Sequence, residues 1–270
     1  MRIIPWERPV TREAPPRPGR DSKRRGARTP TDAVYLRDLF STSARHYERV
    51  NMVTSLGQVV RWRREVIRAA RLRPADRVLD AFCGPGSMAE RAFPNLGPQG
   101  RLVLVDLSPV MLREARMRIE QRAKDRSGPQ PAVSYIAGDL LGDDLDLREF
   151  DVILAGWGLR YVDDVHAALT RMHTFLRPEG RIVLVEFTRP PSVGWGTPAH
   201  YYFRYILPRI GSWLARDRES HEYLRVSCAG FLGGQELEHA VEEAGFTVIY
   251  RRTYLDGLVT ILTAVTTRLG

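Results

Sequence analysis

The feature that most constrains the fold is a short apolar run that ends in two glycines and leads directly into a helical segment. The run 78–81 is followed by Gly84-Pro85-Gly86, and Ser87 begins a stretch with helical spacing. Both glycines allow a tight turn and a close approach to a ligand, because they carry no Cβ. Free N–H groups and the positive end of a helix at such a junction favour an electron-rich ligand. A Gly-x-Gly pair alone is equally typical of an ordinary turn.

Downstream of this loop, short apolar segments alternate with helical ones. Strands are predicted over 77–82, 101–106, 132–137, 151–155 and 181–187, and helices over 87–93, 108–125, 164–176 and 235–244. Two further strands, 246–254 and 258–266, are predicted to form an antiparallel hairpin at the sheet edge, turning near Asp256-Gly257. The pattern predicts an α/β fold with a doubly wound, mostly parallel, seven-stranded Rossmann-like sheet. Ligands of such sheets lie at the carboxyl ends of the strands.

Two helices are expected before the first strand. Asp32 is placed to cap the first, whose apolar positions are Val34, Leu36, Leu39 and Phe40 and which is followed by a polar and aromatic stretch over 41–51. The second is expected to run from Ser55 to Leu72. The buried face predicted for the second helix consists of Leu56, Val59, Val60, Val66, Ile67 and Ala70. We therefore expect residues 32–270 to form one domain, with cap helices over 32–73 and an inserted, aromatic-rich helical cover over 190–232.

The net charge of +9 is concentrated in the first 31 residues. These hold nine basic and three acidic side chains and six prolines, so they carry +6 and leave only +3 for the rest. A segment of this composition buries too little apolar surface to offset its ordering entropy, and it is predicted to be a disordered tail. Because the body is nearly neutral, nucleic acid is not the expected partner. The tail is interpreted as a solvated segment, with anionic lipid as an alternative contact.

The remaining composition indicates a cytoplasmic protein without a metal site. No run of about eighteen apolar residues occurs, and the first residues lack the pattern of a secretory signal. The two cysteines, Cys83 and Cys228, cannot supply a zinc site or a disulfide framework. Cys83 is expected to pack beneath the glycine loop.

Three carboxylates fall at the ends of predicted strands: Asp80, Asp106 and Asp139. Asp106 is placed to accept the ribose hydroxyls of a nucleoside, and Asp139 an adenine amino group. NAD enzymes share such features, but their third glycine is absent, because Gly86 is followed by Ser87-Met88-Ala89. Asp80 suits a cationic tail better than a pyrophosphate, and no P-loop lysine follows. S-adenosylmethionine, which carries an ammonium and a sulfonium, fits this arrangement.

From about Phe40 to Thr266 the chain resembles the class I S-adenosylmethionine-dependent methyltransferases, specifically the ubiquinone/menaquinone C-methyltransferase family. The motifs that carry the resemblance are, in chain order, Tyr47…Asn51, Ser55-Leu56-Gly57, Trp62-Arg63-Arg64, Val105-Asp106-Leu107-Ser108, Met111-Leu112, Gly158-Leu159-Arg160, Leu176-Arg177-Pro178-Glu179-Gly180, Glu186-Phe187, Tyr205 to Gly211, Tyr223-Leu224 and Ala244-Gly245-Phe246.

The resemblance implies S-adenosyl-L-methionine as cofactor and indicates its site. Gly84 and Gly86 would line its methionine part, Asp106 would hold the ribose, and Asp139 would lie near the adenine. Tyr47 would come from an N-terminal helix that closes over the cofactor, with an ordinary interface aromatic as the alternative. The full set of cofactor-binding residues expected is Tyr47, Arg63, Asp80, Gly84, Gly86, Asp106, Leu107, Met111, Gly138, Asp139, Leu140 and Gly156.

The catalytic candidates are Arg160, Tyr161 and His46. Arg160 stands at the family's arginine position, where it would stabilise a phenolate, and the alternative is a structural salt bridge to Asp163 or Asp164. Tyr161 replaces the family's asparagine and is suited to hydrogen-bond to or stack on an aromatic acceptor. His46 adjoins Tyr47 and is a weaker candidate for a base.

The implied function is methyl transfer to a quinol or other aromatic small molecule, with C-methylation in menaquinone or ubiquinone biosynthesis as the family's reaction. The departures from the family pattern, at Tyr161, 140–143 and 226–228, all concern the acceptor side. A specialised-metabolite O-, N- or C-methyltransferase is therefore the main alternative, ahead of a cofactor-binding homologue without methyl transfer and of an RNA-modifying enzyme. A polyprenyl acceptor would add peripheral membrane contact through the tail, and a homodimer is left open.

Overall fold

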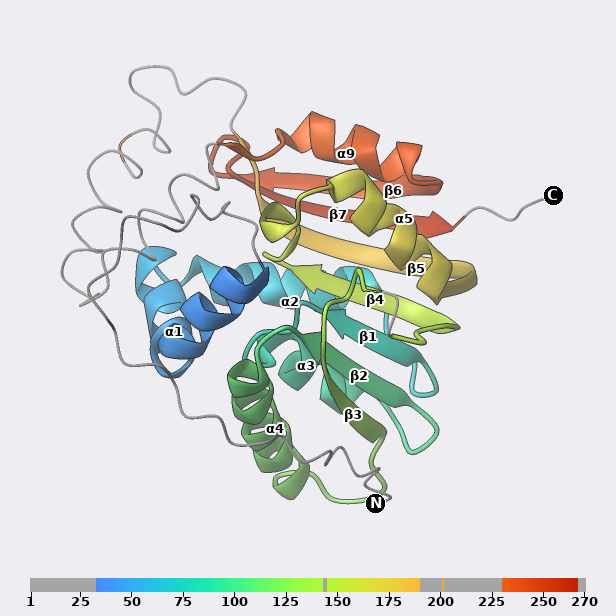
Figure 1. The fold of residues 1–270 in the computed structure, drawn as a ribbon. Helices are drawn as coiled ribbons and strands as arrows, with labels where there is room; N and C mark the ends of the chain where they lie inside the picture. The colour runs from blue at the N-terminus through green and yellow to red at the C-terminus, as the bar shows by residue number, and fades with distance from the viewer. Residues whose placement is uncertain (1–32, 143–144, 190–200, 202–229, 267–270) are drawn as a thin grey trace.

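The computed structural model describes residues 33–142, 145–189, 201 and 230–266. A twisted central sheet carries helices on both faces, and helix α1 (Ala33–Thr54) lies at one end of it (Figure 1). The predictions for the tail 1–31 and for most of the cover 190–232 lie outside the described residues. No helix in the described part of the chain is both long enough and apolar enough to cross a membrane.

The sheet has seven strands in the order β3-β2-β1-β4-β5-β7-β6. The parallel strands are β1 (Arg77–Ala81), β2 (Arg101–Asp106), β3 (Ala132–Ala137), β4 (Phe150–Gly156) and β5 (Leu176–Phe187). The last two, β6 (Phe246–Tyr254) and β7 (Val259–Thr266), form an antiparallel hairpin, with β6 at the edge and β7 beside β5. The predicted fold class is confirmed, and β5 begins five residues earlier than its apolar run indicated.

Helices cover both faces of this sheet. One face packs against α2 (Gln58–Ala70), α3 (Ser87–Ala92) and α4 (Pro109–Lys124), and the other against α5 (Val165–Phe175) and α9 (Gly234–Glu243). Successive strand side chains point to opposite faces, so Val78 belongs to the first core and Leu79 to the second. Burial on both faces explains why these strands are continuous apolar runs.

The start of α4 follows from its local sequence. Ser108 is its N-cap and its Oγ accepts a hydrogen bond from the Met111 N–H at 3.3 Å, while Pro109 occupies the first helical position. This cap fixes the amino end of α4 directly after β2, beside the glycine loop.

The prediction for the first two helices was wrong in its boundaries. Helix α1 is continuous through the polar stretch 41–51, and α2 begins at Gln58 rather than Ser55. Leu56 and Gly57 both have positive φ (50° and 78°), which forces a turn. Leu56, predicted to be buried, is 64% exposed. Gly57 is the N-cap of α2, and the Ser55 Oγ accepts a hydrogen bond from the Val59 N–H in its first turn at 3.1 Å.

The chain closes on itself after β5. Arg189 forms an isolated bridge with Gly233, and its N–H donates to the Leu232 carbonyl at 3.0 Å. Its guanidinium also binds both carboxylate oxygens of Glu236 on α9, at 2.6 and 2.8 Å. The two flanks of segment 190–229 are therefore held together beside the end of β5.

Candidate active site

Asp80 lies in β1 below the glycine loop and is fully buried. Its Oδ2 accepts a hydrogen bond from the Ala89 N–H at 2.8 Å, which ties β1 to α3. Burial raises the pKa of this carboxyl well above its usual range; the Ala89 N–H and Arg63 oppose this shift, and the nearby Asp106 adds to it. A cationic ligand would stabilise the ionised form of this carboxyl, which burial destabilises.

Asp106 closes β2 and binds the glycine loop. Its Oδ2 accepts from the Gly84 N–H at 2.8 Å, and its Oδ1 accepts from the Ser108 N–H at 2.9 Å. Burial nevertheless raises the pKa of Asp106. The two backbone donors hold the carboxylate in one orientation at the edge of the loop, as a ligand that presents paired hydroxyls requires.

The two glycines of the loop have different structural roles. Gly86 has a φ of +78°, and a Cβ there would lie 2.8 Å from the Ala115 Cβ, so this glycine permits α3 and α4 to pack closely. Gly84 has a φ of +52°, but a Cβ there would meet no atom within 4 Å. Gly84 therefore borders open space, where a bound cofactor would pass close to the backbone.

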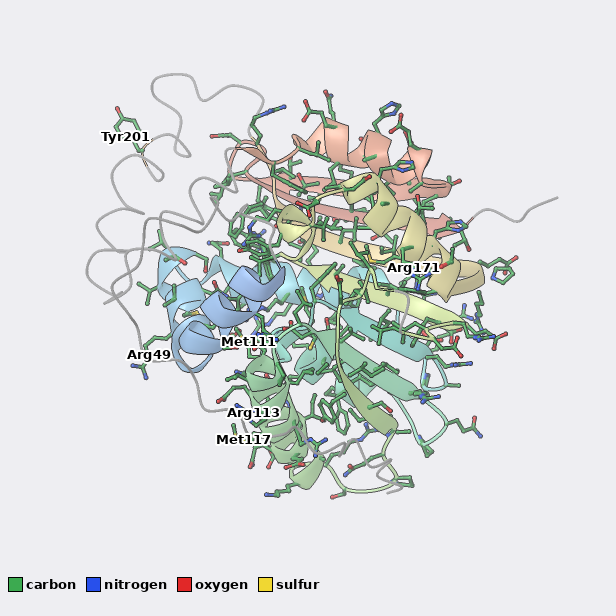
Figure 2. The ribbon with its side chains drawn as sticks, in the orientation of Figure 1. Arg49, Met111, Arg113, Met117, Arg171 and Tyr201 are labelled. Atoms are coloured by element: carbon green, nitrogen blue, oxygen red, sulfur yellow. The ribbon has the colours of Figure 1, made fainter. Side chains whose placement is uncertain are left out.

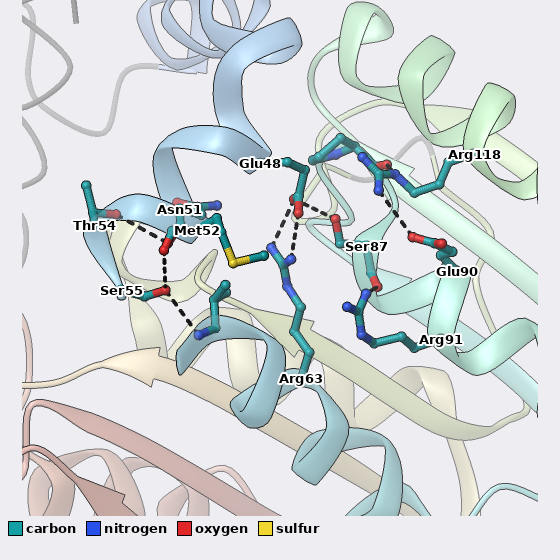
Figure 3. A network of polar contacts seen from close by, with 12 residues as sticks. Glu48, Asn51, Met52, Thr54, Ser55, Arg63, Ser87, Glu90, Arg91 and Arg118 are labelled. Atoms are coloured by element: carbon teal, nitrogen blue, oxygen red, sulfur yellow. Dashed lines mark hydrogen bonds and ion pairs between the residues drawn. The ribbon is translucent and has the colours of Figure 1, made fainter. Parts of the chain in front are cut away.

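Helix α1 lies over this loop and is attached to it by polar contacts (Figure 3). Glu48 binds the Arg63 guanidinium through both oxygens, at 2.7 and 3.0 Å, and accepts from the Ser87 hydroxyl at 2.6 Å. Nearer the start of α1, the hydroxyls of Ser41 and Ser108 are hydrogen-bonded at 2.8 Å. The predicted Arg63 is only 2% exposed and faces the site from α2.

Tyr47 lies on α1 near the acceptor-side arginine. Burial raises the pKa of its phenol, and the charges of Arg160 and Arg63 and a hydrogen bond from Asn51 oppose that shift. Tyr47 therefore lies within electrostatic reach of both Arg63 and Arg160. His46 belongs to α1, but its side chain lies outside the described residues.

Arg160 is buried in the short 3-10 helix η2 (Leu159–Tyr161) after β4. One guanidinium nitrogen donates to Glu186 in a fully buried ion pair, and the other donates to the Tyr161 hydroxyl at 2.5 Å. The guanidinium also lies over the rings of Tyr161 and Phe187, 4.4 and 5.3 Å from their centroids. The structure thus shows an ion pair of Arg160 with Glu186, a residue that the sequence analysis did not propose as its partner. Asp164 caps α5 through the Ala167 N–H.

Aromatic rings join the two halves of the site. Phe187 packs against Trp62 and Trp157, each with centroids 6.3 Å apart, and Arg63 lies 5.4 Å from the Trp157 ring centroid. Several buried polar atoms here have no hydrogen-bond partner among the described residues: Trp62 Nε1, Arg63 Nε, Trp157 Nε1 and Glu186 Oε2. Others lie elsewhere, at Arg77, Arg171 and Thr263. Each such atom in a native structure needs an explanation, and a bound ligand or water is one of them.

The loop after β3 holds three of the predicted residues. Asp139 is exposed, and its Oδ1 accepts from the Leu141 N–H at 2.9 Å. Leu140 is buried next to it, and the Gly138 N–H donates to the Asp106 carbonyl at 3.1 Å. These residues therefore lie beside the carboxyl end of β2, as predicted.

The remaining predicted residues line the same edge. Met111 is buried at the end of α4 that faces α1 (Figure 2), and Leu107 is half-buried just before the Ser108 cap. Gly156 ends β4, where a Cβ would lie 3.0 Å from the Met88 Cε. Cys83 is buried beneath the loop, as predicted, and burial raises the pKa of its thiol, which argues against a nucleophilic role.

Sequence reasoning missed two charged residues of the site, Glu48 and Glu186. Glu186 carried a usable signal, because an acidic residue near the end of an apolar strand had already singled out Asp106. No sequence signal pointed to Glu48, because its pairing with Arg63 depends on the turn between α1 and α2.

Fold and site together define a Rossmann-like S-adenosylmethionine-dependent methyltransferase. The chain belongs to the ubiE/COQ5 methyltransferase family, whose model matches residues 28–266. Similar proteins include demethylmenaquinone methyltransferase of Geobacillus kaustophilus, 30% identical over 220 residues, covering 82% of this chain and 92% of that protein. The Staphylococcus aureus enzyme of the same name is 29% identical and covers 82% and 88% of the two chains.

Solved structures support the fold assignment. Magnesium protoporphyrin IX methyltransferase from Synechocystis aligns with a TM-score of 0.59 at 18% identity, over 87% of this chain and all of that one. An S-adenosylmethionine-dependent methyltransferase from Aquifex aeolicus aligns with a TM-score of 0.51 at 13% identity, over 87% and 99% of the two chains. At these identities the likeness concerns the fold alone.

Proposed function

We propose that the chain transfers the methyl group of S-adenosylmethionine to a ring carbon of a quinol, as the names of its demethylmenaquinone methyltransferase relatives suggest. The observation that carries the proposal is the buried Arg160–Glu186 pair at the ends of β4 and β5, surrounded by aromatic rings. A cation in an apolar, aromatic setting is suited to a flat ligand on which negative charge develops.

On the cofactor side, we assign the ammonium group to Asp80. Its carboxylate is buried, and Arg63 is the cation among the described residues that acts on it. Asp106 would accept the ribose hydroxyls, since its two oxygens are already oriented by the Gly84 and Ser108 N–H groups. The open space beside Gly84 would admit the methionine part of the cofactor.

The other assigned residues surround these contacts. Asp139 would accept from the adenine amino group, and Arg63 would bind the cofactor's carboxylate. Apolar and backbone contacts would come from Gly86, Leu107, Met111, Gly138, Leu140 and Gly156, with Tyr47 closing the site from α1.

On the acceptor side, we assign the phenolate to Arg160. The sulfonium supplies an activated methyl group, so the protein chiefly has to align the acceptor, exclude water and manage a proton. A quinol ring carbon becomes nucleophilic when its phenolic oxygen loses a proton. The Arg160 guanidinium would stabilise that oxygen, and the Tyr161 hydroxyl, bonded to the same guanidinium, would lie beside it.

A different aromatic acceptor is the second candidate, with methylation at carbon, oxygen or nitrogen. It is favoured by Tyr161, whose ring occupies space on the acceptor side 4.4 Å from the Arg160 guanidinium. His46 would be the alternative base in that case.

The domain organisation is part of the proposal. Residues 32–270 would form the methyltransferase domain, with 32–73 as cap helices and 190–232 as a cover over the acceptor. The basic residues 1–31 would bring the enzyme to an anionic membrane surface, where a polyprenyl quinol resides.

The direct test is incubation with methyl-labelled S-adenosylmethionine and chemically reduced demethylmenaquinol. Labelled menaquinol bearing a new ring-carbon methyl is the expected product, with the oxidised quinone as the control that should not react, since it has no hydroxyl to ionise. An O-methylated product, or turnover only with other phenols, would favour the second candidate.

A further inference from the structure

Glu186 is a buried carboxylate with one engaged oxygen and one that is not. It is 1% exposed near the end of β5. Its Oε1 accepts from the Arg160 guanidinium and from the Phe187 N–H at 2.9 Å. Its Oε2 has no hydrogen-bond partner among the described residues, although the backbone N–H of Arg160 also lowers the pKa of this carboxyl. A buried acceptor without a donor is destabilising, by roughly 1–3 kcal/mol or more for a charged group, so this oxygen calls for a functional explanation.

A second atom of the same kind lies on the adjoining chain segment. Trp157 follows β4, and its backbone N–H donates to the Val185 carbonyl at 2.8 Å, one residue before Glu186. Its indole N–H also lacks a partner among the described residues. The adjoining ends of β4 and β5 thus each carry a buried polar atom without a hydrogen-bond partner among the described residues.

We infer that Glu186 is the catalytic residue that takes the hydroxyl proton of the methyl acceptor, and that Arg160 orients its carboxylate for this step. The inference rests on the proposed function, because it requires a phenolic acceptor at this end of the sheet. It adds the base that the arginine cannot be, since a guanidinium stays protonated throughout the physiological range.

The step balances as follows. The O–H bond of the acceptor breaks and an O–H bond to Glu186 Oε2 forms, leaving a phenolate. The ring carbon then forms a bond to the methyl group of the sulfonium, whose S–C bond breaks with its electron pair staying on sulfur. The ring C–H proton leaves to water while Glu186 returns its proton to the acceptor oxygen, so one proton is released overall.

Electrostatics suit this exchange. One negative charge lies beside the Arg160 guanidinium before and after the transfer, first on Glu186 and then on the phenolate, so no new charge is created in the buried site. Burial also raises the pKa of Glu186, against the opposing effects of Arg160 and the Phe187 N–H. The carboxylate is thereby a stronger proton acceptor than an exposed glutamate.

The test is the pH dependence of the single-turnover rate in wild type and in Glu186→Gln. Above the carboxyl pKa the wild-type rate should be flat, because the proton stays within the complex. In Glu186→Gln the proton must leave to solvent, so the rate should rise about tenfold per pH unit, and at pH 7 it should be lower by roughly 10²-fold. Within the part of the chain that the structure describes, Tyr161 from η2 and Tyr47 from α1 are the other titratable groups that contact or act on Arg160, and they are unchanged in the variant.

A second measurement does not need methyl transfer. A nitrophenol bound to the S-adenosylhomocysteine complex reports its own ionisation by absorbance. Its ionised fraction should be independent of pH in wild type and should depend on pH in Glu186→Gln. Parallel behaviour of the two proteins in both measurements, or a nitrophenol that does not bind to the wild type, would overturn the inference.

The controls separate chemistry from folding and from acceptor identity. S-adenosylhomocysteine affinity should stay within about twofold in Glu186→Gln, and the double variant Arg160→Gln/Glu186→Gln removes both buried charges if the single variant folds poorly. Glu149→Gln breaks the exposed pair with Arg77 at the opposite, amino end of the parallel strands and should leave both profiles unchanged. If the wild type methylates no quinol but the ionised fraction of bound nitrophenol is independent of pH, the proposed substrate is wrong. The role of Glu186 as the base then still holds.

Discussion

The carboxylate of Glu48 and the guanidinium of Arg63 form a two-point ion pair, 2.7 and 3.0 Å long, that fastens α1 to α2 over the glycine loop (Figure 3). The Glu48 side chain is 27% exposed, whereas that of Arg63 is 3% exposed. The arginine therefore depends on this partner, and the placement of α1 depends on the pair.

Replacing Glu48 with Gln should loosen α1 without unfolding the sheet. The buried Arg63 loses its counter-charge, so we expect about 1–3 kcal/mol less stability for the docked helix. Tryptic cleavage after the exposed Arg49 should accelerate about tenfold, which corresponds to roughly 1.4 kcal/mol of easier opening.

Glu90→Gln is the matched control for this variant. Glu90 pairs with Arg118 at 3.2 Å on the outer side of the same region, so its removal should leave cleavage within α1 almost unchanged. Equal acceleration in both variants would mean that the Glu48–Arg63 pair does not hold the helix.

Low pH should release α1 through the same pair. Burial alone would raise the pKa of Glu48, but Arg63 and the Ser87 hydroxyl together lower it below its usual value. For a carboxyl with a lowered folded-state pKa, the stabilisation is present above the unfolded-state pKa and is lost as pH falls through the folded-state value. Cleavage within α1 by a protease that is active in acid should therefore rise at low pH in wild type and change less in Glu48→Gln.

Cofactor affinity should fall on acidification at a higher pH than an ordinary aspartate would cause. Burial raises the pKa of Asp80, and its ionised form is the one that binds the cofactor's ammonium. The affinity for S-adenosylhomocysteine should drop by up to about tenfold per pH unit below the raised pKa. Calorimetric titrations between pH 8 and pH 5 measure this slope. In Asp80→Asn the affinity should depend less on pH, and the remaining dependence should come from Asp106.

In the cofactor-free protein, the contribution of Asp80 to the free energy of unfolding should change with pH in the opposite direction. Because its folded-state pKa is raised, its contribution to stability is full below the unfolded-state pKa and is lost as pH rises through the folded-state value. Comparing unfolding free energies of wild type and Asp80→Asn across pH checks the sign. A contribution that grows as pH rises would contradict a carboxyl pKa raised by burial.

Asp106→Ala should reduce cofactor affinity about tenfold or more, the scale of one or two lost hydrogen bonds. The variant also frees the Gly84 N–H, which the carboxylate now holds at 2.8 Å. Isothermal titration with S-adenosylhomocysteine measures the loss. Asp125→Ala, at the far end of α4, is the control, and similar affinity in all three proteins would exclude a ribose contact at Asp106.

The two loop glycines should respond differently to alanine. Gly86→Ala brings a methyl group 2.8 Å from the Ala115 Cβ, so the melting temperature should fall, and Ala115→Gly should partly restore it. In Gly84→Ala the melting temperature should change less, because the added methyl group meets no protein atom. Cofactor affinity should fall, because the methyl group enters the space proposed for the cofactor. Loss of affinity without loss of stability in both variants would contradict the packing role of Gly86.

The sheet could be predicted from the sequence because its strands are buried on both faces. Each strand is a continuous apolar run ended by a polar or turn residue, a signal that depends on local sequence alone. The continuity of α1 could not be predicted in the same way. Its middle is polar, and its contacts, such as Ser41 with Ser108 and Glu48 with Arg63, join it to distant segments.

The site was predictable where position in a strand decides the role. Asp80, Asp106 and Gly84 come together because parallel strands end at one edge. The Arg160–Glu186 ion pair was not predictable, because the two residues come from different elements whose side chains meet only in the folded structure. The alternatives named for Arg160 were near in sequence, and its partner lies 26 residues away on the adjoining strand.

The closure at Arg189 has a consequence for how this enzyme family can diversify. Because Arg189 meets Gly233 and Glu236, segment 190–229 leaves the sheet and returns to it at one fixed point beside Glu186. Its length and sequence are thereby uncoupled from strand pairing, since long insertions between fixed ends cost little closure entropy. Replacing residues 190–229 with the corresponding stretch of a relative should therefore leave the pairing of β5 with β7 intact.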